Sequence, residues 1–493
     1  MNIREILVRR SLRALIEALI SQDQVRSFVL SQVEKALYKE AQETGMQWSL
    51  RQVQQDRLDC ASALLHGLDR LMQRGFISKK CLRSVLEGFL GNVFLNEDSQ
   101  KALNRLGFDP PSFITISPTG KCNLKCTGCY ASDAALRGGQ LSFEVFDRIC
   151  REKRELFGSH FTVISGGEPF LWRDGEWDLL KLAARHPQDV FMVYTNGTLL
   201  DEKLVARIAE TGNVSPCISV EGFEAETDGR RGHGVFQKIL DAMANLRKYG
   251  VIFGISATAT KNNWELITSE KFTDFYYFDQ GALYCWIFQY MPIGRGQTFD
   301  LVVPPEARVE MLKRMWRLVR ERQVFMVDFW NSGTASLGCI AAGRGTGYFY
   351  INWDGDIMPC VFAPYAAANI NELYARGENL IAALNTPLFR RIREWQNDYG
   401  YEAPPHKTGN WLCPCAIRDH FDEFARAVRE CGGRPINEEA QQAMADPTYY
   451  EKMVEYGKRM QELTAEMWRE QYLEQEQDMP LAPSRERERV AAG

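Results

Sequence analysis

Short apolar runs alternate with amphipathic segments between residues 112 and 325, and this alternation constrains the fold more than any other feature of the sequence. Such runs predict parallel strands joined by right-handed helical crossovers. The predicted strands are Phe113 to Ser117, Phe161 to Ser165, Val190 to Tyr194, Val214 to Val220, Ile252 to Thr258 and Leu283 to Tyr290. The predicted helices include Phe143 to Phe157, Phe236 to Tyr249 and Met311 to Arg322. We expect an α/β fold, an open sheet or a partial barrel, with its site in the loops after the strands.

The regions on either side of this alternation have other patterns. Residues 1–109 carry helical stripes of leucine and predict an N-terminal helical domain that ends at Pro110-Pro111. The alternating region covers 110–328, and 329–434 is a region punctuated by glycine, cysteine and tryptophan. Residues 435–493 predict a C-terminal helix and a disordered tail. The helical leader is interpreted as a cap packed on the barrel, with a dimer surface or an amphipathic platform as alternatives.

Composition narrows the class of protein. The net charge of −5 gives no electrostatic reason to expect a nucleic-acid partner. No apolar run is long enough to be a transmembrane segment, and the first residues lack the apolar core of a signal peptide. An odd count of 13 cysteines without a secretory signal favours metal binding in a reducing compartment over disulfides. We therefore expect a cytoplasmic, metal-binding protein.

Three cysteines follow the first predicted strand within one loop. Cys122, Cys126 and Cys129 are separated by three and then two residues. A [4Fe-4S] cluster is usually held by four cysteines, so three thiolates would leave one iron open for a substrate or cofactor. A structural zinc ion would need a fourth local ligand, and the first histidine after the loop is His160. The spacing therefore predicts an iron-sulfur cluster with one open iron.

Small polar residues and glycine recur at the ends of the next three predicted strands. The segments are Ser165 to Pro169, Thr195 to Gly197 and Ser219 to Gly222. Glycine lets backbone amides and carbonyls approach a ligand closely, and proline fixes the exit of a turn. Each segment alone is also typical of a plain strand-to-helix turn. Their recurrence after consecutive strands indicates a ligand pocket at this edge of the sheet.

Taken together, these motifs resemble those of radical S-adenosylmethionine (SAM) enzymes. They are Cys-Asn-Leu-Lys-Cys-Thr-Gly-Cys-Tyr, Gly-Gly-Glu-Pro, Thr-Asn-Gly and Ile-Ser-Val-Glu-Gly. The resemblance implies a partial (β/α)6 barrel in which Cys122, Cys126 and Cys129 hold a [4Fe-4S] cluster whose open iron binds SAM. It also implies an electron donor of the flavodoxin or ferredoxin type, reductive cleavage of SAM, and a 5′-deoxyadenosyl radical that takes a hydrogen from a substrate.

The resemblance further implies the residues of the SAM pocket. The turn expected to meet the methionine amino group comprises Gly166, Gly167, Glu168 and Pro169. Ser219 and Glu221 are expected near the ribose, with Asn196 in the same pocket. Arg231 matches an arginine that pairs with the methionine carboxylate through its two-pronged guanidinium, and a surface charge is the alternative.

One position departs from the family pattern. The residue before the third cysteine is often aromatic in this family and is placed by the adenine, but here it is Gly128. Tyr130 follows the third cysteine directly. We therefore expect a backbone contact to the adenine at this position rather than aromatic stacking, with Tyr130 beside it in the pocket.

A second group of cysteines lies near the C-terminus. Its members are Cys339, Cys360, Cys413 and Cys415, with Trp353 to Asp356 as a predicted hairpin turn between the first two. The pattern is similar to the shortened auxiliary-cluster extension, a reduced SPASM domain, of radical SAM enzymes, and it implies a second [4Fe-4S] cluster. Four thiolates also suit structural zinc, which stays open as an alternative. Cys431 is a possible replacement ligand.

The predicted function is that of a radical SAM oxidoreductase. Its substrate is expected to be a small molecule, a lipid-like molecule or a peptide, and the reaction an oxidation, a carbon–carbon bond formation or a rearrangement. A peptide or protein maturase, a SAM-dependent methyl or alkyl transferase, and a non-catalytic electron-transfer protein are the alternatives. The remaining cysteines, Cys60, Cys81, Cys150, Cys217 and Cys285, lie in helix or strand patterns and are interpreted as core thiols.

Overall fold

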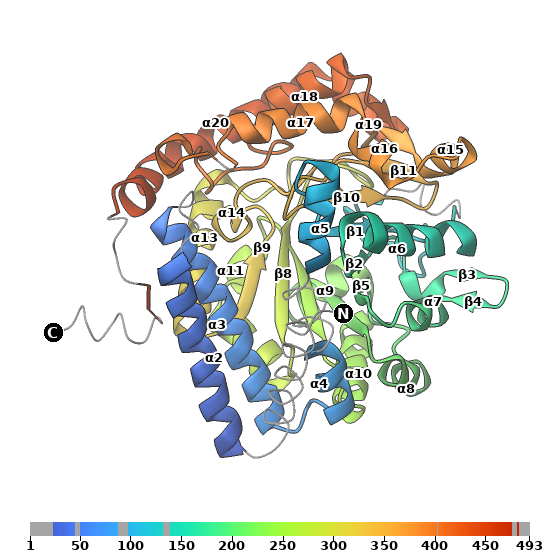
Figure 1. Ribbon diagram of the computed structural model, residues 1–493, viewed down its shortest axis with the longest axis vertical. Helices are drawn as coiled ribbons and strands as arrows, with labels where there is room; N and C mark the ends of the chain where they lie inside the picture. The colour runs from blue at the N-terminus through green and yellow to red at the C-terminus, as the bar shows by residue number, and fades with distance from the viewer. Residues whose placement is uncertain are drawn as a thin grey trace.

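A ten-stranded sheet forms the centre of the protein (Figure 1). The computed structural model describes residues 23–44, 50–86, 97–131, 139–401, 403–475 and 481–482. The strand order is β13-β11-β10-β1-β2-β5-β6-β7-β8-β9, and all neighbours from β10 to β9 are parallel. The parallel strands are β1 (Phe113–Ile116), β2 (Phe161–Ile164), β5 (Val190–Thr195), β6 (Val214–Val220), β7 (Gly254–Ala259), β8 (Tyr284–Gln289), β9 (Phe325–Asp328) and β10 (Tyr348–Ile351). This arrangement confirms the expected α/β partial barrel.

The six predicted strands are all present, but the sheet is larger than the sequence indicated. Strand β9 pairs in parallel with β8, in the register Tyr284 to Phe325. It is as long as β1 and β2, but it lies beyond the last predicted helix, Met311 to Arg322, and was not predicted. Strand β10 adds to the other side of β1 and turns back into β11 (Asp356–Met358), which pairs with β13 (Ala368–Asn369). The predicted hairpin turn lies between β10 and β11. The second cysteine region therefore extends the barrel sheet directly.

Helices pack on the outside of the parallel strands. They are α6 (Phe143–Phe157), α7 (Leu179–Arg185), α8 (Glu202–Thr211), α9 (Glu224–Arg231), α10 (Val235–Lys248), α11 (Trp264–Ile267), α12 (Glu270–Thr273) and α13 (Pro305–Glu321). Local sequence fixes the ends of α6. Ser142 accepts the N–H of Val145 at its start, and Gly158 ends it with a left-handed φ of 65°. Phe146 and Ile149 are fully buried against the sheet.

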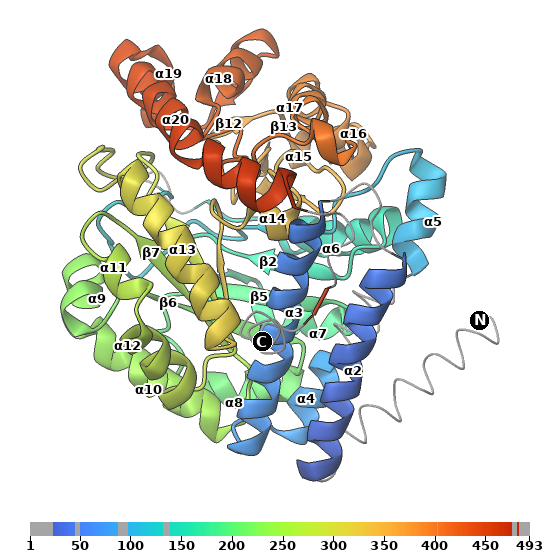
Figure 2. The same ribbon diagram turned by 90° about the vertical axis from the view of Figure 1, so that its left-hand side faces the viewer.

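The helical leader covers the open side of the barrel (Figures 1 and 2). Its described helices are α2 (Asp23–Thr44), α3 (Arg51–Gln73), α4 (Lys79–Leu86) and α5 (Glu97–Leu106). Helix α3 packs against β9, α13 and the short helix α14 (Gly333–Ser336). Leu68 and Leu71 of α3 form a buried cluster with Ile252 and Leu283. Of the three interpretations of the leader, the packed cap is therefore the one that matches the described helices.

Ion pairs reinforce this contact. Arg320 of α13 donates to Asp56 at 2.6 Å and to Asp59 at 3.0 Å, and both carboxylates are buried in α3. Tyr472 donates to the other oxygen of Asp56 at 2.8 Å. The leader, the barrel and the C-terminal helix thus meet at one buried carboxylate.

The C-terminal elements form a layer across one end of the barrel (Figure 2). They are β12 (Tyr365–Ala366), α15 (Ile370–Ala375), α16 (Leu380–Leu384), α17 (Pro387–Asp398), α18 (Phe421–Glu430), β14 (Arg434–Pro435), α19 (Glu438–Ala445) and α20 (Pro447–Trp468). The predicted C-terminal helix is two helices, because Pro447 starts a new helix at the Asp446 N-cap. The predicted tail at 485–489 lies outside the described residues, and the four-part division of the chain stays a prediction. No helix of the described segments is long and apolar enough to cross a membrane.

Candidate functional site

The first cysteine loop, residues 117–131, leaves β1 and is held by backbone contacts on both sides. From the loop after β2, Gly167 N–H donates to the carbonyl of Thr119 at 3.0 Å, and Glu168 N–H donates to the carbonyl of Lys121 at 2.8 Å. These bonds attach the start of the loop to the Gly-Gly-Glu-Pro turn. The Gly-Gly-Glu-Pro turn, which the sequence predicts to contact a ligand, thus also holds the first cysteine loop in place.

Two arginines hold the far end of the same loop. The N–H of Thr127 donates to the backbone carbonyl of Arg230 at 3.1 Å, and Nε of Arg230 donates to the carbonyl of Thr127 at 3.1 Å. After β8, Arg295 N–H donates to the carbonyl of Cys129 at 2.9 Å. The loop is therefore fixed by elements that follow three different strands.

Both glycines of the turn are required by this close approach. A Cβ on Gly167 would lie 2.2 Å from the carbonyl oxygen of Lys121. Gly166 has a φ of 126°, and a Cβ there would lie 2.6 Å from the carbonyl oxygen of Thr119. The glycines make room for the first cysteine loop as well as for a ligand.

The three thiols of the loop lie at one end of a shared cavity. Burial raises the pKa of Cys122 to about 11, and the nearby Glu168, Cys126 and Cys129 add to the rise. The Nδ2 atom of Asn196 lies 3.9 Å from the Cys122 sulfur. Raised thiol pKa values mean that a bound metal would have to displace protons from this site.

Glu168 organises two strand ends at once. Its buried carboxylate accepts the Thr195 hydroxyl at 2.9 and 3.0 Å, the Asn196 N–H at 2.9 Å and the Phe170 N–H at 3.2 Å. Burial raises the pKa of this carboxyl to about 7 despite these bonds. Pro169 starts the one-turn helix Pro169–Leu171 and directs the chain away from the turn. The two predicted motifs after β2 and β5 are joined through one side chain.

A buried ion pair follows β6. One carboxylate oxygen of Glu221 accepts Arg230 Nη1 at 2.5 Å, Arg231 Nη2 at 2.5 Å and Arg231 Nε at 2.9 Å. Arg231 is largely buried, with its Nη1 atom 4.0 Å from the Cys126 sulfur, which excludes the surface-charge alternative. The second carboxylate oxygen of Glu221 is buried and has no hydrogen-bond partner among the described residues. A buried acceptor of this kind suits a hydroxyl donor of a bound ligand.

The other predicted pocket residues lie around the same cavity. Ser219 of β6 and Ser256 of β7 face each other at 3.3 Å between their hydroxyl oxygens. Tyr130 bonds to the Ser165 hydroxyl at 2.6 Å and packs edge-on to Phe362. The structure thus brings the predicted residues of four strand ends to one place.

The cavity has a volume of about 900 Å³. It extends from the first cysteine loop through the barrel to the inner faces of α2 and α3, and its lining is mostly apolar. Trp286, Phe288 and Tyr290, from β8 and the residue after it, lie on its wall. This volume is at the upper end of the range for small-molecule pockets.

The second cysteine group combines three separate segments. The Cys415 thiol and the backbone N–H groups of Ala416 and Ala341 point at the Cys339 sulfur, and these hydrogen bonds lower the pKa of Cys339. Cys360 lies beside them, and its sulfur is 3.0 Å from the Tyr348 hydroxyl. N–H and O–H groups directed at sulfur stabilise thiolates and tune metal–sulfur centres.

The thiol of Cys413 points away from the other three cysteines of the second group. Its thiol lies 3.6 Å from the Thr464 hydroxyl of α20, and burial raises its pKa to about 12. Its electrostatic neighbours are Asp419 and Arg308 rather than the other thiols. Within the described chain, three cysteines of the second group are therefore close together, and the fourth lies on the same loop with its thiol turned toward α20.

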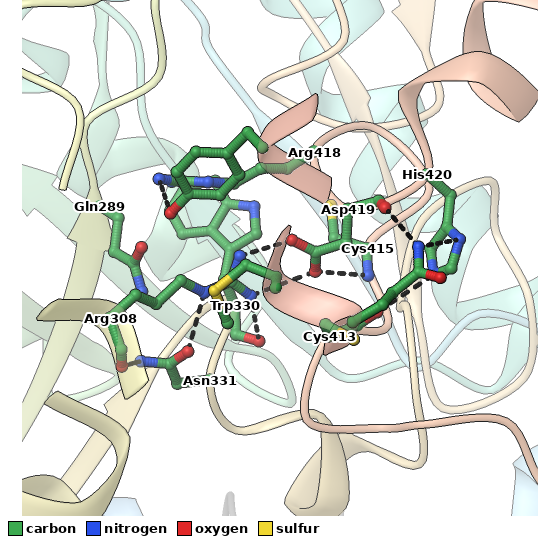
Figure 3. A network of polar contacts seen from close by, with 12 residues as sticks. Gln289, Arg308, Trp330, Asn331, Cys413, Cys415, Arg418, Asp419 and His420 are labelled. Carbon is green, nitrogen blue, oxygen red and sulfur yellow. Dashed lines mark hydrogen bonds and ion pairs between the residues drawn. The ribbon is translucent and has the colours of Figure 1, made fainter. Parts of the chain in front are cut away.

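A fully buried arginine anchors this loop (Figure 3). Arg308 of α13 forms a two-pronged ion pair with Asp419, and its Nε donates to Asn331 Oδ1 at 2.9 Å. The Asp419 carboxylate also accepts the N–H of Cys415 at 3.1 Å. Burial by itself would lower the pKa of Arg308, but Asp419 raises it above the usual value. Helix α13 is thereby connected to the backbone of Cys415 through Arg308 and Asp419.

Cys431 lies apart from both groups. It ends α18, and its charged neighbours are Glu430, Arg391 and Glu394. The five cysteines interpreted as core thiols are all buried, as predicted. The described His, Cys, Asp and Glu side chains include no group of three arranged to hold a single metal ion.

Comparison with known families identifies the barrel. The model of the radical SAM superfamily matches residues 116–266, which include the first cysteine loop and the strand ends up to β7. The chain contains a radical SAM domain. SAM and a [4Fe-4S] cluster are the cofactors of this superfamily.

Several characterised proteins are similar to this chain. An AdoMet-dependent heme synthase of Methanosarcina barkeri is 28% identical over 313 residues, which cover 58% of this chain and 85% of the relative. The mycofactocin maturase MftC of Mycobacterium ulcerans is 29% identical over 304 residues, covering 59% and 79%. Among solved structures, Streptococcus suis SuiB bound to its precursor peptide SuiA aligns with a TM-score of 0.48 at 18% identity, covering 60% of this chain and 71% of SuiB. With SAM bound, SuiB aligns over 64% of its length at a TM-score of 0.44.

The residues present fit the cofactors of a radical SAM domain. Three thiols of one loop face a cavity, which suits a cluster with one open iron. The unpartnered Glu221 oxygen is a buried acceptor, and the other oxygen of the same carboxylate pairs with Arg231, whose Nη1 lies 4.0 Å from the Cys126 sulfur. Gly128 has a φ of 64°, and a Cβ there would lie 2.6 Å from the ring of Tyr290. The ring of Tyr290, the residue directly after β8, therefore occupies the space beside position 128.

Sequence reasoning missed several residues that hold the two cysteine groups in place. Arg230 and Arg295 fix the first cysteine loop, and Arg308 with Asp419 anchors the second cysteine group. Arg230 is next to Arg231, which was predicted, and Arg295 lies between Gly294 and Gly296. The sequence therefore contains a weak indication that each belongs to the site. Arg308 and Asp419 are 111 residues apart. Only the folded chain reveals that pair.

Proposed function

We propose that this protein is a radical SAM oxidoreductase that removes a hydrogen from a substrate bound in the barrel cavity. The observation that carries the proposal is the position of Cys122, Cys126 and Cys129 at one end of a large cavity that runs through the barrel. When bound, the reduced cluster supplies the electron that cleaves SAM, and the radical so formed takes the hydrogen. The chain supplies the fixed loop, the pocket and the exclusion of water.

We infer individual roles from the contacts at the site. Cys122, Cys126 and Cys129 would hold the cluster. Gly166 and Gly167 would present backbone groups to the methionine end of SAM, while Asn196, Ser219 and Tyr130 border the same space. The unpartnered oxygen of Glu221 would accept a ribose hydroxyl. Arg231 would face the methionine carboxylate only with the guanidinium atoms that Glu221 leaves free.

We assign the second cysteine group to an auxiliary [4Fe-4S] cluster held by Cys339, Cys360, Cys413 and Cys415. The hydrogen bonds directed at the Cys339 and Cys360 sulfurs support this assignment. Cys413 would have to turn its thiol from Thr464 toward the other three. A flavodoxin or ferredoxin as electron donor and a cytoplasmic location remain predictions of the sequence.

A second candidate is a peptide-modifying maturase. The observation that favours it is the similarity to MftC over 59% of this chain. Transfer of a methyl or alkyl group and pure electron transfer have no comparable support. A large cavity open to the first cysteine loop has no purpose in an electron carrier.

The experiment is anaerobic reconstitution with iron and sulfide, followed by SAM and dithionite. We expect 5′-deoxyadenosine and methionine to form, as measured by chromatography. The protein depleted of iron is the control and should leave SAM intact. Intact SAM after incubation with a protein whose clusters are fully loaded and reduced would contradict the proposed function.

A further inference from the structure

The cavity continues through the barrel well beyond the space that SAM needs. It begins at the first cysteine loop and Gly166, and it also touches Phe113, Phe161 and Leu283 at or before the starts of their strands. Strands here have up to seven residues, and at 3.3 Å per residue the cavity spans about 20 Å along the barrel. The interior of a typical (β/α)8 barrel is filled by side chains over this distance.

Space remains partly because one wall of the barrel carries small side chains. Ser215, Ser219 and Ser256 lie on β6 and β7 and line the cavity. A wall of larger side chains on β8, including Tyr284 and Trp286, faces the same space. Large branched side chains at the three serine positions would fill this part of the barrel, so the small side chains leave the cavity open.

The leader supplies a further wall, and apart from Arg57 its main members are apolar. Leu30, Val33 and Leu37 from α2 and Leu64, Leu65 and Leu68 from α3 line the cavity. They recur at helical spacing, so each helix presents one apolar stripe to the cavity. All but Leu68 are only partly buried, although they lie on the inward side of the leader. Apolar side chains in such a position are stabilised when a ligand covers them.

The serine hydroxyls of the barrel wall are bonded to neighbouring groups, whereas the side-chain oxygens of Asn213 and Gln289 on the same wall are buried without a partner among the described residues. Ser215 bonds to the Tyr284 hydroxyl at 2.8 Å and to a backbone carbonyl at 3.0 Å, and Ser219 faces Ser256. A peptide threaded through the cavity would bring an N–H and a C=O group with every residue, and each would need a partner. A hydrocarbon chain makes no such demand.

We propose that the cavity binds the hydrocarbon chain of a long-chain lipid, with α2 and α3 as the wall that recognises it. The inference deepens the proposed function, on which it rests for the chemistry at the first cysteine loop. Binding itself is independent of that chemistry. The chain lies along the barrel, with the leader leucines on one side and the β6–β7 serine wall on the other, and one end reaches the first cysteine loop.

Lipid binding can be measured without SAM cleavage. The full-length, reconstituted protein is titrated with cis-parinaric acid, a fluorescent polyene fatty acid, and saturated fatty acids of increasing length compete for it. We expect affinity to rise about three- to fourfold for each added methylene, up to a length near that of the cavity. Competition that does not depend on chain length would overturn the proposal. So would displacement of the probe by apolar peptides but not by fatty acids.

Variants locate the binding site. Leu64→Trp places a larger ring in the cavity and should weaken binding of the probe at least tenfold. Gln73→Trp is the matched control, because it adds the same ring at the exposed end of α3 and should bind like the wild type. Wild-type affinity in Leu64→Trp would overturn the proposal. The chain-length series on the wild type needs no variant, so misfolding of Leu64→Trp leaves a decisive measurement.

The two proposals fail in different ways. A protein that binds fatty acids with the expected length dependence but leaves SAM intact contradicts the proposed function and keeps the lipid site. A protein that cleaves SAM but shows no saturable binding of the probe contradicts the lipid site and keeps the proposed function.

Discussion

The two cysteine groups are built in different ways. The first takes three thiols from one loop, and backbone bonds from neighbouring loops hold that loop in place. The second takes its thiols from three segments, and buried side chains such as Arg308 and Asp419 hold them. A loop motif is specified locally and needs room around its backbone, whereas a dispersed group depends on the tertiary structure. We therefore expect the two groups to respond differently to substitution.

The largest difference should come from the cysteines themselves. Cys126→Ala removes a ligand of the proposed SAM-binding cluster, and we expect SAM cleavage to fall at least about a hundredfold. Cys415→Ala should disable the second group but leave SAM cleavage measurable, because the first cysteine loop does not depend on it. Production of 5′-deoxyadenosine by the reconstituted variants is the measurement. Cys150→Ala is the control for loss of a buried thiol, and equal effects of Cys126→Ala and Cys415→Ala would contradict the separation of the two groups.

Removing the anchor of the second group should destabilise the protein strongly. Arg308→Met leaves the Asp419 carboxylate buried without its counter-charge, at an expected cost of about 3–5 kcal/mol in unfolding free energy. Denaturant unfolding measures this change, and iron content should drop at the second group more than at the first. Arg459→Met, which breaks an exposed pair with Glu306, is the control and should change nothing measurable. Equal stability of the two variants would show that the buried pair does not anchor the second group.

Glu168 should make the first group sensitive to pH. Its pKa in the folded protein is about 7, above the ordinary 4.5, so burial favours the neutral form. The stability it contributes is complete below pH 4.5 and is lost as the pH rises through 7, which amounts to about 3 kcal/mol at most. Glu168→Gln cannot titrate and should remove this slope. Unfolding measured from pH 5 to 8 checks the expectation, and parallel pH profiles for the two proteins would contradict it.

The close packing of the first cysteine loop gives a smaller effect. Gly167→Ala places a Cβ against the Lys121 carbonyl, and we expect a loss of about 1–3 kcal/mol together with weaker SAM binding. Calorimetry of SAM binding and denaturant unfolding measure the two consequences. Gly229→Ala in α9 is the matched control, since a Cβ there meets no atom within 4 Å. If the two substitutions behave alike, the glycine is not needed to make room for the loop.

The same contrast explains how much the sequence could predict. The first cysteine loop, the strand-end motifs and six strands are local patterns, and they could be found because each depends on neighbours in the sequence. Strand β9 is as long as the predicted β1 and β2, but it lies beyond the last predicted helix, and only its pairing with β8 shows that it belongs to the sheet. Arg308 and Asp419 lie in unrelated segments, so no spacing rule connects them. The unusual direction of Cys413 also depends on Thr464 in a distant helix.

The leader illustrates a different limit. Its leucine stripes predicted helices with an apolar face, and the described helices confirm that. The same stripes are compatible with a packed cap, a dimer surface or an amphipathic platform, because periodicity shows which residues share a face but not what covers it. Contacts with β9, α13 and α14 identify the cap, and part of the apolar face of α2 and α3 lines the cavity instead of packing on the described elements.

The smallest expected effect concerns the one cysteine outside both groups. Cys431 was a possible ligand of the second group in the sequence, but in the structure it ends α18 among Glu430, Arg391 and Glu394. Cys431→Ser should therefore leave the iron content of both groups and the rate of SAM cleavage unchanged, because no described thiol of either group contacts it. Cys360→Ser is the comparison, since it removes a buried thiol bonded to Tyr348 and should lower the iron content. A loss of iron in Cys431→Ser equal to that in Cys360→Ser would mean that the second group rearranges around its metal. Cys431 would then replace Cys413, whose buried thiol points toward α20.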